Sequence, residues 1–140
     1  LVAFRDTVGI VGLLQAACPH RKASLFFGRN EDNGLRCVYH GWKFDADGQC
    51  VDMPSEPLAS NYKEKVRIRS YPTVEIGDVV WTYMGASDAQ PPLPAFEWAR
   101  VPKTHRAVTV GYQLSNWLQG LEGGIDSAHS SFLHNMNIKK

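Results

Sequence analysis

Two short pairs of metal-binding residue types stand out in the first third of the chain. Cys18 and His20 are separated by one residue, and Cys37 and His40 by two. Structural zinc sites usually take cysteine and histidine ligands in separate pairs, whereas each pair here mixes the two. The mixed pairs favour a two-iron cluster in which one iron takes both thiolates and the other both imidazoles. Tetrahedral zinc, or a coincidence of buried thiols and core histidines, remains the alternative.

A second group of candidate ligands, Asp126, His129 and His134, lies near the end of the sequence. Asp126 and His129 have the spacing of one helical face, but an ideal helix would turn His134 away from His129. Both histidines could reach one metal ion only if the helix widens or breaks near Ser130–Ser131, an irregularity that often marks functional sites. The alternative is that Asp126 caps a helix and both histidines lie on the surface.

The elements that must position these residues differ along the chain. In the N-terminal part, short runs rich in β-branched and aromatic residues alternate with Gly, Asp and Asn turns, which predicts a mainly β sandwich or small barrel. The sequence AQPPLP at 89–94 cannot continue a central strand or a helix interior. We therefore expect one domain over residues 1–88, a linker over 89–105 and the incomplete N-terminal part of a second domain over 106–140.

The second domain is expected to begin with a strand and continue with helices. The strand is predicted over 106–113. Ser115 is a candidate N-cap for a helix through Leu121, which Gly123–Gly124 would end. A second helix is predicted over 125–133, with apolar residues along one face.

Composition narrows the class of protein. The 140 residues carry a net charge of +1 with no long basic run, so nucleic-acid binding is not expected. No apolar stretch is long enough to span a bilayer, and we expect no signal peptide, because the chain opens with a predicted strand. The odd number of cysteines favours a reducing compartment, which predicts a cytoplasmic protein without a membrane partner. Because the chain lacks an initiator methionine and a closing signal, we expect a fragment truncated at both ends.

The first constellation resembles a known family. CPHR followed by CVYHGW is similar to the Rieske [2Fe–2S] motif. The resemblance implies that Cys18 and Cys37 hold one iron and His20 and His40 the other. Respiratory Rieske proteins carry an additional cysteine in each loop, and this chain does not, so it resembles the Rieske ferredoxins and Rieske oxygenases. Cys50 lies outside the loops and is interpreted as a small buried hydrophobe.

The second constellation resembles one of those two branches. The segment from Asn116 to His134 is similar to the mononuclear non-haem iron motif of phthalate-dioxygenase-type oxygenase subunits. That resemblance implies that His129 and His134 bind Fe(II). It also implies that Asp126 bridges His129 to a cluster-ligating histidine, here His40, in the neighbouring subunit of a homotrimer. Glu122 is either a residue behind the iron ligands or an ordinary helix-surface glutamate.

The family resemblance implies a mainly β Rieske domain followed by the start of an α+β catalytic domain. The implied function is the oxygenase component of an aromatic ring-hydroxylating dioxygenase or an O-demethylating monooxygenase. Its implied partners are a reductase or ferredoxin, O₂ and an aromatic substrate, with a carboxylate such as phthalate expected. The third iron ligand lies outside this sequence. A Rieske ferredoxin-type electron carrier and a zinc-stabilised binding module remain the alternatives.

Overall fold

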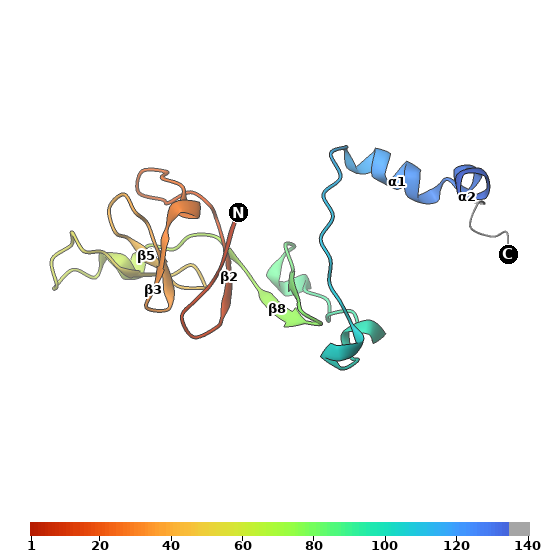
Figure 1. The fold of residues 1–140 in the computed structure, drawn as a ribbon. Coiled ribbons are helices and arrows are strands. Elements are labelled where there is room, and N and C mark those ends of the chain that lie inside the picture. Colours follow the sequence, from red (N-terminus) through yellow and green to blue (C-terminus); the bar gives the residue numbers. More distant parts are fainter. Residues whose placement is uncertain (135–140) are drawn as a thin grey trace. The chain divides into compact units, whose positions relative to one another are not determined.

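The chain divides into two units. In the computed structural model, which describes residues 1–134, the first unit is Leu1–Ala107 and the second begins at Val108. All the strands of the described chain lie in the first unit, and the two α-helices lie in the second (Figure 1). The prediction of a mainly β fold before the helical segment is therefore confirmed.

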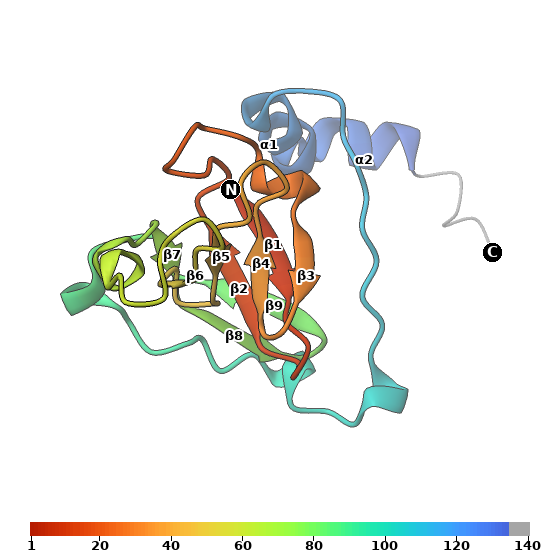
Figure 2. The same ribbon diagram turned by 90° about the vertical axis from the view of Figure 1, so that its left-hand side faces the viewer.

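Three antiparallel sheets form the first unit (Figure 2). Their strand orders are β1-β2-β7, β3-β4-β5-β6 and β8-β9. The strands are β1 (Val2–Arg5), β2 (Val11–Leu14), β3 (Arg29–Glu31), β4 (Gly34–Arg36), β5 (Lys43–Phe44), β6 (Cys50–Asp52), β7 (Ser70–Tyr71), β8 (Thr73–Ile76) and β9 (Val79–Thr82).

Two 3-10 turns lie between strands, and three further 3-10 turns and two α-helices follow the last strand. None of the helices in the described part of the chain is long and apolar enough to cross a membrane. The 3-10 turns are η1 (Leu25–Phe27), η2 (Tyr62–Lys65), η3 (Ser87–Ala89), η4 (Glu97–Ala99) and η5 (Lys103–His105), and the α-helices are α1 (Trp117–Ile125) and α2 (Ser127–Leu133).

A single hydrophobic core includes all three cysteines. Leu14, Leu25 and Phe44 are completely buried, and Cys18, Cys37 and Cys50 belong to the same cluster of buried side chains. The interpretation of Cys50 as a small buried hydrophobe is confirmed, and burial raises the pKa of its thiol to about 11. Because Cys18 and Cys37 are core residues, packing of the sheets helps to fix the loops that carry them.

Two reversals of the chain use the same four-residue turn, Asp-X-X-Gly. Asp6 begins the turn between β1 and β2, and Asp45 begins the turn between β5 and β6. In each turn a carboxylate oxygen of the aspartate accepts hydrogen bonds from the backbone N–H groups two and four residues later, at 2.7–3.0 Å. Gly9 and Gly48 end the two turns with φ of +98° and +82°, which glycine adopts without a steric penalty.

Polar contacts attach the β8–β9 hairpin to the three-stranded sheet. The Arg5 guanidinium donates to both carboxylate oxygens of Glu75, at 2.6 and 2.5 Å. The Thr73 hydroxyl donates to the backbone carbonyl of Val11 at 2.7 Å. The hairpin is therefore connected to both β1 and β2.

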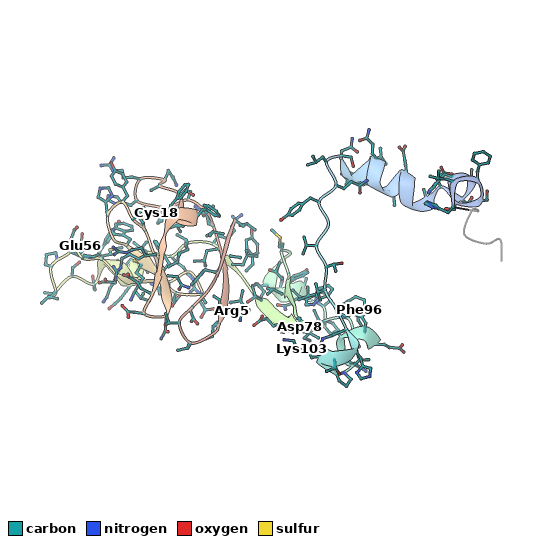
Figure 3. The ribbon with its side chains drawn as sticks, in the orientation of Figure 1. Arg5, Cys18, Glu56, Asp78, Phe96 and Lys103 are labelled. Carbon is teal, nitrogen blue, oxygen red and sulfur yellow. The ribbon has the colours of Figure 1, made fainter. Side chains whose placement is uncertain are left out.

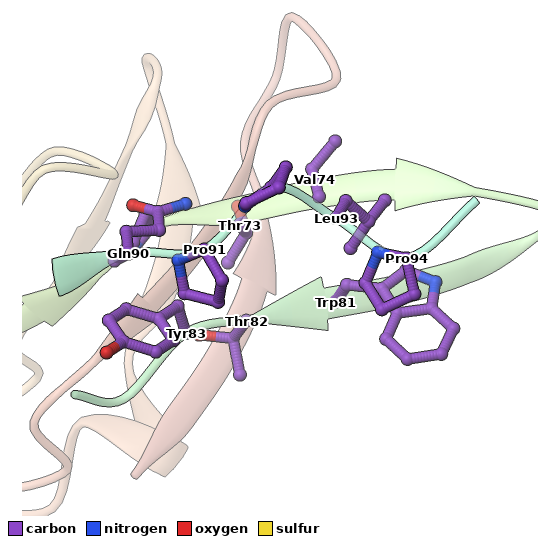
Figure 4. Close-up of a pocket in the computed structure, with 11 residues that line it drawn as sticks. Thr73, Val74, Trp81, Thr82, Tyr83, Gln90, Pro91, Leu93 and Pro94 are labelled. Carbon is purple, nitrogen blue, oxygen red and sulfur yellow. The ribbon is translucent and has the colours of Figure 1, made fainter.

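The segment predicted as a linker is folded against this hairpin. Trp81 of β9 stacks on Phe96, with ring centroids 5.3 Å apart, and Phe96 stacks on Trp98 at 5.8 Å. Arg106 donates to the Asp78 carboxylate in the hairpin turn at 3.0 Å. The proline run over 90–94 lies along the same two strands and forms one wall of a pocket of about 210 Å³ (Figure 4).

The second unit departs from three expectations. Residues 106–113 pair with no strand in the described chain, so the predicted strand is wrong: an extended segment needs a neighbour for its backbone hydrogen bonds. The N-cap of α1 is Asn116 and not Ser115, because the Asn116 side chain accepts the Gln119 N–H at 3.0 Å. The helix continues through Gly123–Gly124. The glycines do not end the helix because an interior glycine costs only about 1 kcal/mol. The second helix is confirmed, starting at Ser127.

The paired turns provide a matched test of packing at Gly48. A Cβ at Gly48 would overlap the backbone carbonyl oxygen of Ile68, whereas a Cβ at Gly9 would meet nothing within 4 Å. Both substitutions to alanine share the strain of positive φ, about 1–3 kcal/mol. Gly48→Ala should lose about 1–3 kcal/mol more of the free energy of unfolding than Gly9→Ala, because a backbone segment must move. Denaturant unfolding measures both values, and equal losses would contradict this packing.

Candidate metal centre

The two Cys-His loops of the first unit have the same backbone hydrogen-bond pattern. Cys18 follows β2, and its turn is seen in Figure 3. The Cys18 N–H donates to the Ala23 carbonyl at 2.9 Å, and its carbonyl accepts the Lys22 N–H at 2.9 Å. In the second loop, the Cys37 N–H donates to the Trp42 carbonyl at 2.8 Å, and its carbonyl accepts the Gly41 N–H at 3.0 Å.

The similarity extends to the backbone angle that closes each turn. Lys22 and Gly41 occupy the same position, four residues after the cysteine, with φ of +60° and +77°. The two loops are therefore equivalent turns, each with a cysteine at its start and a histidine inside it. The different spacing of the two pairs places the histidines at successive positions of the same turn.

The two thiols lie together inside the core. Cys18 and Cys37 are each 2% exposed, and their side chains are within hydrogen-bonding reach of each other. Burial is the main cause that raises the pKa of the Cys18 thiol. The backbone N–H groups of His20 and Arg21 point at the same sulfur and lower its pKa, so donors are in place for a thiolate.

The two imidazoles lie together at the surface. The ring centroids of His20 and His40 are 4.4 Å apart, and His20 is exposed while His40 is half-buried. Desolvation, followed by the proximity of His40 and Arg21, lowers the pKa of His20. These effects favour the neutral imidazole, which is the form that binds a metal.

Aromatic side chains flank the imidazole pair. Trp42 stacks on His20 with a centroid distance of 4.7 Å and an interplanar angle of 8°, and it also packs against the hydrophobic core. Tyr39 lies against His40 at 3.9 Å, and Tyr62 meets the edge of Trp42 at 6.2 Å. Trp42 therefore both packs on the core and covers one face of His20.

The donor set fits a [2Fe–2S] cluster with mixed ligands. Within residues 1–134, no group of three or more His, Cys, Asp or Glu side chains gathers as a site for one metal ion. The four residues form two pairs, thiol with thiol and imidazole with imidazole. Two thiolates for one iron and two imidazoles for the other is the distribution that a Rieske centre requires.

In the second unit, Asp126 lies between the two α-helices. One of its carboxylate oxygens accepts the backbone N–H groups of Ala128 and His129, at 2.9 and 3.4 Å, and so caps α2. The other oxygen lies 3.2 Å from Nδ1 of His129. The backbone N–H groups are the main cause that lowers the pKa of this carboxyl, and His129 contributes. The capping alternative is thus observed together with a contact between Asp126 and His129.

His129 and His134 come close without the irregularity that was expected. Their ring centroids are 5.6 Å apart. The helix is regular across Ser130–Ser131, so the widening or break that the spacing required for both histidines to reach one metal ion is not seen there. The helix instead ends at Leu133, and His134 is its C-cap, which lets the last side chain leave the helical path.

Sequence reasoning missed Arg36, whose guanidinium reaches the second Cys-His loop. Its Nη1 donates to the Gly41 carbonyl at 2.5 Å, and it also contacts Glu31 and Asp52. The available signal was an arginine directly before a ligand cysteine, in a strand whose other residues are apolar or small.

Comparisons with known proteins agree with this arrangement. Residues 1–72 match the Rieske [2Fe–2S] domain, and residues 82–140 match a model described as LigXa C-terminal domain like. The chain is 52% identical over 134 residues to the 3-chlorobenzoate-3,4-dioxygenase oxygenase subunit of Comamonas testosteroni, which covers 96% of this chain and 31% of the relative. It is 53% identical over 140 residues to the phthalate 4,5-dioxygenase oxygenase subunit of Pseudomonas putida, with 99% of this chain and 31% of the relative covered.

A solved structure supports the same grouping. Dicamba monooxygenase with non-haem iron and dicamba superposes with a TM-score of 0.59 at 35% identity, over 67% of this chain and 29% of that one. The chain thus spans about a third of the length of the curated relatives it matches.

The family match decides between the branches that the Cys-His motif left open. A Rieske domain implies a [2Fe–2S] cluster. The match over residues 82–140 favours an oxygenase subunit over a plain Rieske ferredoxin. The expected family is therefore confirmed: the chain belongs to the Rieske oxygenases, as the Rieske domain and the following part of a phthalate-dioxygenase-like oxygenase subunit.

Proposed function

We propose that the protein containing this chain is the oxygenase component of a Rieske-type aromatic ring-hydroxylating dioxygenase or O-demethylating monooxygenase. The match of residues 1–72 to the Rieske domain, together with the two equivalent turns, carries this proposal. A [2Fe–2S] cluster, when bound, would supply one-electron transfer, and a mononuclear Fe(II) would supply the activation of O₂.

The proposed ligands of the cluster are the four residues of the two turns. Cys18 and Cys37 would hold one iron, and His20 and His40 the other. The burial of the two thiols and the 4.4 Å separation of the two imidazole rings support this assignment. The N–H groups of His20 and Arg21, which point at Cys18, would stabilise its thiolate.

The proposed mononuclear iron ligands are His129 and His134, two members of a two-His-one-carboxylate site. Because Asp126 accepts from Nδ1 of His129, it selects the tautomer whose Nε2 is free to bind a metal. Asp126 would also contact His40 of a neighbouring subunit and so act catalytically as a bridge between the two iron sites. Glu122 lies one helical turn before Asp126, and we assign it a supporting position behind the ligands.

The proposed substrate class and partners follow the relatives. The two relatives described above are named for chlorobenzoate and phthalate, so an aromatic carboxylate is proposed as substrate. A reductase or ferredoxin would supply the electrons. We also propose a homotrimer that acts in the cytoplasm, without membrane insertion and without a nucleic-acid partner. The domain boundaries predicted from sequence, 1–88, 89–105 and 106–140, are kept as part of this proposal.

The first test is an electron paramagnetic resonance spectrum of the dithionite-reduced protein, titrated against potential. We expect a Rieske signal with a midpoint in the low part of the roughly −150 to +300 mV range of Rieske centres. A silent spectrum together with bound zinc would overturn the redox function and indicate a structural zinc site instead.

The ligand role of His40 has a matched control in His105. His40→Ala should abolish the visible absorbance of the cluster and its paramagnetic signal, because one iron loses half of its protein ligands. His105→Ala should change neither, because His105 lies in η5, outside both turns. An unchanged spectrum for His40→Ala would remove this residue from the ligand set.

The bridging role of Asp126 can be separated from its capping role. Asparagine caps helices about as well as aspartate, so Asp126→Asn should preserve α2. In the full-length protein, both iron sites should stay filled, while turnover falls by roughly 10- to 100-fold or more, because the partner that orients His129 is weakened. Iron content and product formation measure the two effects, and normal turnover would exclude the bridge.

A further inference from the structure

We propose that Arg36 is a positioning residue for the Rieske cluster, holding the turn that carries Cys37 and His40 and setting the charge beside it. The inference deepens the proposed function and rests on its assignment of the cluster ligands. Arg36 is the last residue of β4 and directly precedes Cys37.

The guanidinium of Arg36 joins both ends of the second ligand turn. Its backbone leads into Cys37, and its Nη1 donates to the carbonyl of Gly41, the residue after His40, at 2.5 Å. The backbone bonds of the turn already link Cys37 to Gly41 and Trp42. Arg36 adds a side-chain hydrogen bond to Gly41, so the segment from Cys37 to His40 is held at its start and at its end.

The same guanidinium connects the turn to a third segment of the unit. Nη1 also donates to the Asp52 carboxylate at 2.7 Å, and Nε donates to Glu31. Just beyond Asp52, Pro54 lies so close to Gly41 that a Cβ there would come within 2.9 Å of the proline ring. Arg36 therefore connects β3, β6 and the ligand turn through one planar group.

The Arg36 guanidinium is largely buried, so its ion pairs are not those of an exposed surface arginine. The Arg36 side chain is only 11% exposed. Its hydrogen bonds are the main cause that lowers the pKa values of Glu31 and Asp52, so both carboxylates are ionised at neutral pH. Removing the cation would leave two carboxylates and the Gly41 carbonyl without their common donor.

A charge at this position also bears on the reduction potential. Reduction adds one negative charge to the cluster, and a nearby cation stabilises the reduced state more than the oxidised one. Loss of the Arg36 charge should therefore lower the midpoint potential. Loss of the Asp52 charge should raise the midpoint potential, because the positive charge of Arg36 is then neutralised by one carboxylate fewer.

Four variants of the full-length, cluster-containing protein test the inference. Arg36→Met removes the charge and the hydrogen bonds. Arg36→Lys keeps the charge but loses the planar fork that reaches three partners at once. Asp52→Asn removes one partner charge. Arg29→Met is the matched control, because Arg29 pairs directly opposite Arg36 in the β3–β4 register and contacts the same Glu31 at 3.3 Å, but its side chain is 64% exposed.

The measurements are the midpoint potential, the width of the paramagnetic signal and the rate of iron loss to a chelator. We expect a lower potential for Arg36→Met and a higher one for Asp52→Asn. Arg36→Lys should keep a potential close to that of the unmodified protein but lose iron about tenfold faster, with a broader signal. Arg29→Met should match the unmodified protein in all three measurements.

The outcomes separate this inference from the proposed function. A full-length protein without a Rieske signal would refute the ligand assignment itself. A normal signal in that protein, with Arg36→Lys and Asp52→Asn indistinguishable from Arg29→Met, would overturn the role of Arg36 alone. If Arg36→Met does not fold, the lysine and asparagine variants still decide the question.

Discussion

The backbone hydrogen bond from the amides of Cys18 and Cys37 to the carbonyl five residues later is the interaction on which the candidate metal centre depends. It closes the Cys18 and Cys37 turns with the same geometry and turns both sulfurs toward the core. Each turn needs a residue with positive φ, which Lys22 and Gly41 supply. The sheets then have to present the two turns to each other, and the shared core of Leu14, Leu25 and Phe44 beneath them provides that alignment.

The sequence predicts the donor set because ligand chemistry is local. The mixed pairs of cysteine and histidine favour a two-iron cluster, and their resemblance to the Rieske motif implies a Rieske domain. The equivalence of the two turns could not be predicted, because it depends on carbonyls at Ala23 and Trp42 that carry no side-chain signal. Arg36 was missed for a similar reason: its partners, Glu31, Gly41 and Asp52, come from three separate segments.

Local sequence signals alone do not predict where the elements of the second unit form and end. Gly123 and Gly124 were expected to end a helix, yet α1 runs through them to Ile125. The strand predicted for 106–113 has the right side-chain pattern but no partner strand in the described chain. The contact between His129 and His134 was expected to need a distorted helix, whereas it arises at the helix end. The strand fails because it has no hydrogen-bonding partner, and the helices begin and end at the capping residues Asn116, Asp126 and His134.

The opposite placement of thiols and imidazoles gives the metal centre a closed side and an open side. The thiol side belongs to the hydrophobic core, so a reagent can reach Cys18 or Cys37 only when the sheets separate. The imidazole side meets solvent at His20, with Trp42 covering one face of that ring. His20 is thus the exposed part of the centre, and the protection of the two sulfurs from chemical attack depends on the stability of the fold.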